Sequence, residues 1–73
     1  MFWIDPTDND QKGGTKAFMC DTPADVSDLP TSTVLGKGDN DVANQKVAKS
    51  SSCLCLGSGE LYILNSEDKW ISV

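Results

Sequence analysis

The chain has 73 residues, a net charge of −5, and eleven acidic residues against six lysines with no arginine. Because arginine makes most bidentate contacts to phosphates and bases, this composition argues against a nucleic-acid partner. A chain of this size forms one domain at most and buries only about 60% of its unfolded surface, so its own core is marginal.

Few sources of additional stability are open to such a chain. It has three cysteines and no histidine. The odd cysteine number and the absence of an apolar signal core after Ile4 argue against a disulfide framework. No membrane insertion is expected, because no apolar run is long enough to span a bilayer. Oligomerisation is therefore the favoured source of further burial.

Residues 1–15 are interpreted as an N-terminal arm, and residues 16–73 as a single small β-rich domain. The arm opens with the apolar patch Phe2-Trp3-Ile4, which is compatible with an edge strand. The following residues are polar and contain Pro6 and paired glycines, so we expect a loop with mobility.

The next two elements are a strand and a short helix. The apolar run 16–20 predicts a strand. Thr22 followed by Pro23 and then Asp25 is a helix-start signal. Pro30 ends anything helical, so one or two turns are expected, with Val26 and Leu29 facing inward.

The middle of the chain is less regular. Residues 31–35, rich in Thr and Val, are compatible with a strand. Residues 36–41 predict a turn, residues 42–49 show no clear periodicity, and residues 50–52 are a polar spacer.

The last third predicts an antiparallel meander of three strands, in the apolar runs 53–56, 61–65 and 70–73. A two-residue turn at Ser58-Gly59 would pair Cys53 with Leu64. A four-residue loop at 66–69 would pair Asn65 with Trp70.

This register divides the meander into two apolar faces, since directly paired residues share a face. The first face carries Cys53, Cys55, Tyr62, Leu64, Ile71 and Val73. The second is the candidate oligomer or partner interface, formed by Leu54, Leu56, Leu61, Ile63 and Trp70. The short N-terminal half is expected to cover only the first face, which leaves the second as a large apolar patch.

No motif predicts a metal, a cofactor or catalysis. Cys53-x-Cys55 lacks the four ligands and C-x2-C spacing typical of zinc, so buried structural thiols are expected. Asp8-x-Asp10 and the acidic run 39–41 do not fit an EF-hand and are interpreted as solvated turns. With no placed nucleophile or acid–base pair, we expect no enzyme.

Several short motifs resemble small structural proteins of tailed phages and prophages, namely head-fibre, decoration and tail-fibre modules. The similarity lies in Asp21-Thr22 with Asp28-Leu29-Pro30, in residues 52–56, in residues 59–66 and in Trp70, and it covers residues 17–73. It implies a virion location, capsid or fibre proteins as partners, and a homo-oligomer, with a trimer as the expected number.

Three functions follow as hypotheses. The first is a virion structural protein that decorates a capsid or joins a fibre through the second face. The second is an adhesion module that binds a cell-surface glycan through Trp70 and Tyr62. The third is a small acidic inhibitor of a host protein. This third function is the least favoured, because the acidic residues are scattered along the sequence instead of clustered.

Overall fold

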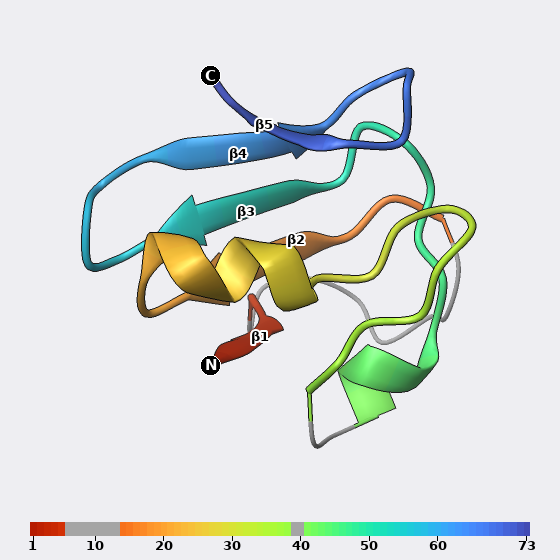
Figure 1. The fold of residues 1–73 in the computed structure, drawn as a ribbon, viewed down its shortest axis with the longest axis horizontal. Coiled ribbons are helices and arrows are strands. Elements are labelled where there is room, and N and C mark those ends of the chain that lie inside the picture. The colour runs from red at the N-terminus through yellow and green to blue at the C-terminus, as the bar shows by residue number, and fades with distance from the viewer. Residues whose placement is uncertain (6–13, 39–40) are drawn as a thin grey trace.

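The computed structural model describes residues 1–5, 14–38 and 41–73. Five short strands form one mixed sheet in the order β1-β2-β3-β4-β5 (Figure 1). The expected fold class, mainly β with a short helical turn, is confirmed. The strands are β1 (Phe2–Ile4), β2 (Ala17–Cys20), β3 (Ser52–Cys55), β4 (Leu61–Leu64) and β5 (Trp70–Ser72).

The sheet is mixed because β2 and β3 are parallel, whereas all other neighbours are antiparallel. The strands β3, β4 and β5 form the expected antiparallel meander. A parallel pair needs a crossover connection. The crossover here runs through residues 21–51 and contains two 3-10 helices, η1 (Pro23–Asp28) and η2 (Asp41–Asn44).

The N-terminal patch belongs to the sheet. Strand β1 lies at the sheet's edge and pairs with β2, with Phe2 opposite Cys20 and Ile4 opposite Phe18. The expected edge strand is therefore confirmed. Most of the predicted arm, residues 6–13, lies outside the described residues.

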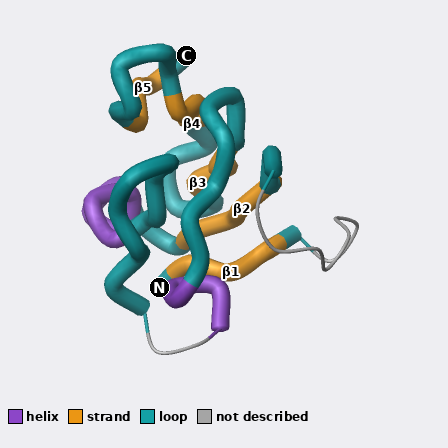
Figure 2. The backbone as a smooth tube through the Cα atoms, turned by 90° about the vertical axis from the view of Figure 1, so that its right-hand side faces the viewer, coloured by secondary structure: helices purple, strands orange, loops and turns teal. Residues whose placement is uncertain are grey.

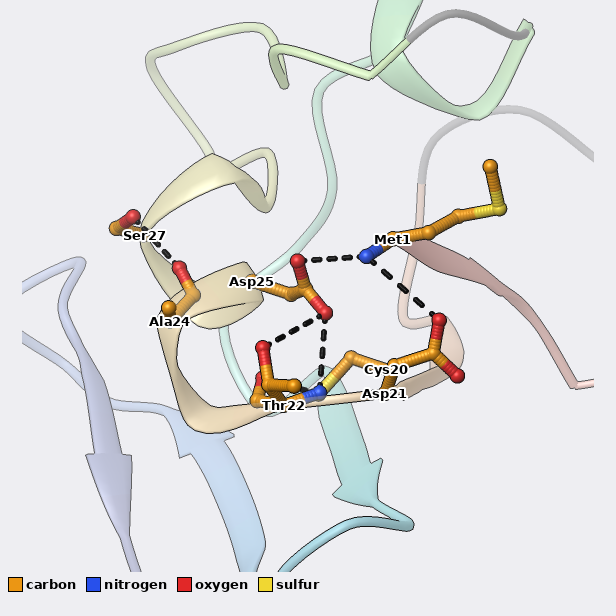
Figure 3. Close-up of polar contacts among 7 residues, drawn as sticks. All are labelled: Met1, Cys20, Asp21, Thr22, Ala24, Asp25 and Ser27. Atoms are coloured by element: carbon orange, nitrogen blue, oxygen red, sulfur yellow. Dashed lines mark hydrogen bonds and ion pairs between the residues drawn. The ribbon is translucent and has the colours of Figure 1, made fainter.

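Helix η1 begins as the sequence predicts. The Asp25 carboxylate accepts hydrogen bonds from the Thr22 backbone N–H at 3.0 Å and from the Thr22 hydroxyl at 3.2 Å (Figure 3). The same carboxylate lies 2.6 Å from the Met1 ammonium, which lowers the pKa of Asp25. This ion pair ties the start of β1 to the helix that covers the sheet.

One face of the sheet carries the core, and we call it the covered face. In Figure 1 helix η1 lies in front of β2 and β3, and in the turned view of Figure 2 it lies to the left of the strands. Leu29 is buried and Val26 packs against the core, as predicted. The buried side chains from strands are Phe2, Phe18, Cys20, Cys53, Cys55 and Leu64, and those from the crossover include Leu29, Ala43 and Val47.

Residues 31–35, whose composition is compatible with a strand, form none, because polar side chains hold this segment in a turn. The Thr31 hydroxyl accepts hydrogen bonds from the N–H groups of Thr33 and Val34. The Thr31 N–H donates to the Val34 carbonyl at 2.8 Å. Such side-chain bonds offer the backbone a local alternative to a strand ladder.

The first hairpin differs from the predicted register by two residues. Cys53 lies opposite Tyr62 instead of Leu64, and Leu54 lies opposite Leu61. The N–H of Cys55 donates to the Glu60 carbonyl at 2.8 Å, so the connection is longer than the expected two-residue turn. A shift of two residues keeps every side chain on its face, since side chains alternate with period two.

The last hairpin differs by one residue, and this changes the faces. Trp70 lies opposite Leu64, and Ile71 lies opposite Ile63. Asn65 and Lys69 close the loop through an N–H to carbonyl bond of 2.9 Å, which leaves residues 66–68 as the loop. The predicted pairing of Trp70 with Asn65 is wrong, and β5 is turned over relative to the prediction.

Candidate interface on the open sheet face

The face opposite the covered face is apolar along all five strands, and we call it the open face. Register places one large side chain or more from each strand on it. These side chains are Trp3, Met19, Leu54, Leu61, Ile63 and Ile71. The buried crossover residues cluster with the side chains of the covered face, and helix η1 lies on that side of the sheet (Figure 2).

The exposed large apolar side chains of the strands all lie on the open face. Ile71 is 46% exposed, Leu61 40% and Leu54 37%, whereas Phe18 and Leu64 on the covered face are 2% and 1% exposed. Trp3, Met19 and Ile63 are half-buried. A contiguous patch of large apolar side chains is typical of a surface that binds a partner.

No strand residue of the open face is charged. Its remaining strand positions are Ala17 and Ser52, and Asp5, whose N–H donates to the Ala17 carbonyl at 2.8 Å, lies at its border just beyond β1. Interface centres are depleted of charged residues and enriched in aromatic residues and methionine. The arrangement can therefore bury a surface against an apolar partner without stranding a charge.

Leu54, Leu61 and Ile63 share one face, as the sequence predicts. Leu56 lies beyond the end of β3, where its N–H donates to the Cys20 carbonyl at 2.9 Å. Its side chain is 53% exposed. Three of the five predicted interface residues therefore lie on the open face, and Leu56 borders it in the turn.

Trp70 is the fifth predicted residue, and its assignment to this face is wrong. It packs on the covered face, with its ring centroid 6.1 Å from that of Phe18 in an edge-on arrangement. Its indole Nε1–H donates to the Pro30 carbonyl at 3.0 Å. The one-residue change in the last hairpin causes this difference, and it puts Ile71 on the open face instead.

The glycan-binding hypothesis gains no support from this geometry. Tyr62 is half-buried on the covered face, opposite Ser72. Burial, together with the nearby Glu60 carboxylate, raises the pKa of the Tyr62 hydroxyl. The indole N–H of Trp70 is already bonded within the chain.

Sequence reasoning missed Trp3, Met19 and Ile71 as open-face residues. The apolar character of both N-terminal runs was a visible signal. What was missing was the parallel pairing that sets Met19 beside Leu54 and, through β2, Trp3 beside Met19. Without that pairing, the N-terminal runs cannot be joined to a face of the meander.

The three thiols lie together on the covered face, as buried structural groups. Cys20 lies opposite Cys55 across β2 and β3, and Cys53 lies opposite Phe18. All three are free and buried. Burial raises the pKa values of Cys20 and Cys53, whereas a hydrogen bond from Ser58 lowers that of Cys55.

Metal binding has no support in the described ranges. Within residues 1–5, 14–38 and 41–73 no group of three or more cysteine, histidine or acidic side chains is arranged to hold a metal ion. The Cys20 Sγ instead contacts the Thr22 carbonyl at 3.4 Å. The thiols therefore act as small apolar core groups.

Comparison of the chain with models of protein families, with curated proteins and with solved structures found no match. Among the described residues, no helix has the length and apolar character needed to cross a bilayer. The open face is therefore the feature on which a functional interpretation depends.

Proposed function

We propose that this chain is a structural assembly protein whose copies associate through the open face, as a capsid-decorating or fibre subunit of a tailed phage. The observation that carries the proposal is the uncharged apolar surface that spans all five strands. Ile71, Leu61 and Leu54 are each more than a third exposed on it. A second copy of the chain can bind to this surface, because two copies present the same apolar surface to each other.

The size of the chain favours assembly over an isolated domain. A single thin sheet with one covered face leaves much of its apolar surface in water. Burying that surface against another copy supplies stabilisation of about 25 cal/mol per Å² of apolar area. The resemblance of residues 17–73 to phage structural modules supports the virion location, and a trimer is the number it implies.

Light scattering on the whole chain at micromolar concentration tests the assembly. We expect an oligomer for the wild type and a smaller assembly for Leu61→Asp and Ile63→Asp, because a carboxylate cannot be buried unpaired in the apolar contact. Val34→Asp is the matched control, since Val34 is 54% exposed but lies in the crossover.

A wild-type monomer at this concentration would contradict the assembly. Assembly of the Leu61 and Ile63 variants as readily as the Val34 variant would contradict the open face as the contact. Virion location has its own test, which is mass spectrometry of purified phage particles. Absence of the chain from the particles would refute the location while leaving the assembly intact.

A further inference from the structure

The outer edge of β5 offers a second contact of a different kind. Strand β5 is the last in the sheet order, so no other described strand pairs with its outer side. In Figure 1 it forms the upper border of the sheet. An edge strand presents backbone N–H and carbonyl groups that can pair with another chain.

The pairing of β5 with β4 shows which groups point outward. Val73 donates its N–H to the Leu61 carbonyl at 2.8 Å, and Lys69 accepts from the Asn65 N–H at 2.9 Å. Residues in an antiparallel pair alternate between bonded and non-bonded positions. The N–H and carbonyl groups of Trp70 and Ser72 therefore point away from β4, whereas those of Ile71 point toward it.

We propose that a second copy of this chain pairs antiparallel with this edge, with the two β5 strands related by a twofold axis at Ile71. In this register Trp70 of one copy and Ser72 of the other exchange both N–H to carbonyl bonds. It is the one twofold register that uses both outward-pointing residues of β5 within the strand. The two sheets then become one continuous sheet.

Side chains and charges agree with this register. Ile71 lies beside Ile71 of the second copy on the open face, in a non-bonded pair where side chains approach most closely. Residues 70–72 carry no charge. Lys69 precedes the strand, and Glu60 accepts a bond from the Ser72 hydroxyl at the other end, at 3.1 Å. Neither charged side chain therefore belongs to the three residues that pair across the edge.

This edge contact is independent of the contact proposed for the open face. It depends on backbone groups of β5, whereas face contact depends on side chains such as Leu61. The two contacts therefore respond to different substitutions. Because the twofold contact closes on itself, it gives a pair of copies, whereas pairing of β5 with β1 of another copy would give open-ended fibres.

Ser72→Pro tests the edge contact. Proline removes the outward N–H without touching the bonds to β4, and edge strands tolerate it where the N–H faces outward. We expect the dissociation constant of the pair to rise at least about tenfold, since two symmetry-related bonds are lost. Ser72→Ala is the matched control, because it removes the hydroxyl bond to Glu60 but keeps the N–H.

Amide hydrogen exchange in the wild-type chain gives a readout that does not depend on a variant folding. We expect hydrogen exchange at the Trp70 and Ser72 amides to become slower as the protein concentration rises. The same concentration dependence should be seen in Leu61→Asp. Fast exchange of both amides at concentrations where the chain is associated, or a chain that stays monomeric, would overturn the proposal. Fibres of unlimited length formed by Leu61→Asp, which lacks the face contact, would also overturn it.

Oxidative cross-linking tests the register. The Cα atoms of a non-bonded antiparallel pair lie about 4.5 Å apart, within disulfide range. We expect Ile71→Cys to form a covalent dimer on mild oxidation with oxidised glutathione, whereas Val34→Cys does not. Ready cross-linking of the Val34 variant, or none at position 71, would overturn the twofold register.

Discussion

Asp68 in the last hairpin loop holds Ser32 in the crossover. Its Oδ1 accepts the Ser32 N–H at 2.9 Å and the Ser32 hydroxyl at 2.6 Å, and its Oδ2 accepts the Thr33 hydroxyl at 2.7 Å. These bonds fasten the crossover to the meander across the covered face. They also lower the pKa of the Asp68 carboxyl well below its usual range.

The first prediction is that this carboxylate stabilises the fold in a pH-dependent way. Because the folded pKa is depressed, the stabilisation is fully present above the unfolded value of about 4 and is lost as the pH falls below it. We expect Asp68→Asn to melt at a lower temperature than the wild type at pH 7. At pH 2–3 the difference between the two melting temperatures should be smaller. Asparagine also tolerates the φ of 64° at this position.

Thermal unfolding followed by circular dichroism between pH 7 and pH 2 measures this effect. Glu67→Gln is the control, since Glu67 is an exposed acid in the same loop. A constant difference between wild type and Asp68→Asn across this pH range would contradict the role given to the carboxylate.

The second prediction concerns two glycines of the first hairpin turn. A Cβ on Gly57 would lie 2.2 Å from the Asp21 carbonyl oxygen, so the turn passes against the start of the crossover. A Cβ on Gly59 would meet nothing within 4 Å, but its φ is +73°. Gly57→Ala should therefore move backbone, whereas Gly59→Ala should only strain one residue.

We expect Gly57→Ala to destabilise by about 3 kcal/mol or more, as overpacking against backbone does. Gly59→Ala should cost about 1 kcal/mol, and Gly59→Asn less, because asparagine tolerates a left-handed backbone. Urea unfolding of the three variants gives the comparison. Equal stability of the two alanine variants would show that the approach of Gly57 to Asp21 does not constrain the turn.

The third prediction separates the two tryptophans. Trp3 lies on the open face and Trp70 packs on Phe18 in the core. In Trp70→Phe, Trp3 is the only tryptophan. We expect its fluorescence emission to shift to the red on dilution, because dissociation exposes the open face to solvent. In Trp3→Phe, the emission of Trp70 should not change with concentration as long as the chain stays folded.

Trp70→Phe should also destabilise the fold by about 1 kcal/mol, because the Pro30 carbonyl loses its indole donor. Fluorescence across a dilution series and urea unfolding supply both measurements. Dilution that shifts Trp70 but not Trp3 would mean that association does not bury the open face.

The fourth prediction is that the thiols of the folded chain are protected. All three are buried, and burial raises the pKa of Cys53 in particular, so little thiolate is available. We expect Ellman's reagent at pH 8 to react only as fast as the chain opens, and to titrate all three thiols in urea. Rapid reaction of one thiol without denaturant would contradict a closed core. Cys55 would be the thiol to examine first, because its pKa is lowered.

Much of the fold follows from local sequence patterns. The strands at 17–20, 61–64 and 70–72 fall within apolar runs, the strand at 52–55 overlaps the run 53–56, and the helix after Thr22 begins with a recognisable cap. The pattern was not decisive at residues 31–35, where Thr and Val are compatible with a strand but none forms. There the hydroxyl of Thr31 and the carboxylate of Asp68 bind the backbone instead, and the second of these contacts is distant in sequence.

The sequence predicted the face of an interface residue correctly only where an error in the strand register left that face unchanged. Leu54, Leu61 and Ile63 kept their face because a two-residue shift preserves alternation. Trp70 changed face because the loop is one residue shorter than expected, with Asp68 in the left-handed region that closes such loops. Both faces are apolar, so hydrophobicity could not decide between the registers.

The parallel pairing of β2 with β3 has a consequence for how the chain reaches its fold. The β3–β5 meander joins segments that are close in sequence, whereas β2 meets β3 only after residues 21–51 have closed into a loop. The entropy cost of closing this loop comes before the contacts between β2 and β3 can form and stabilise the chain. Closure of the loop therefore limits the folding rate. We therefore expect the meander to form early and the docking of β2 and β1 to be the slow step. Until that step is complete, Cys53 and Cys55 lack the strand that shields them.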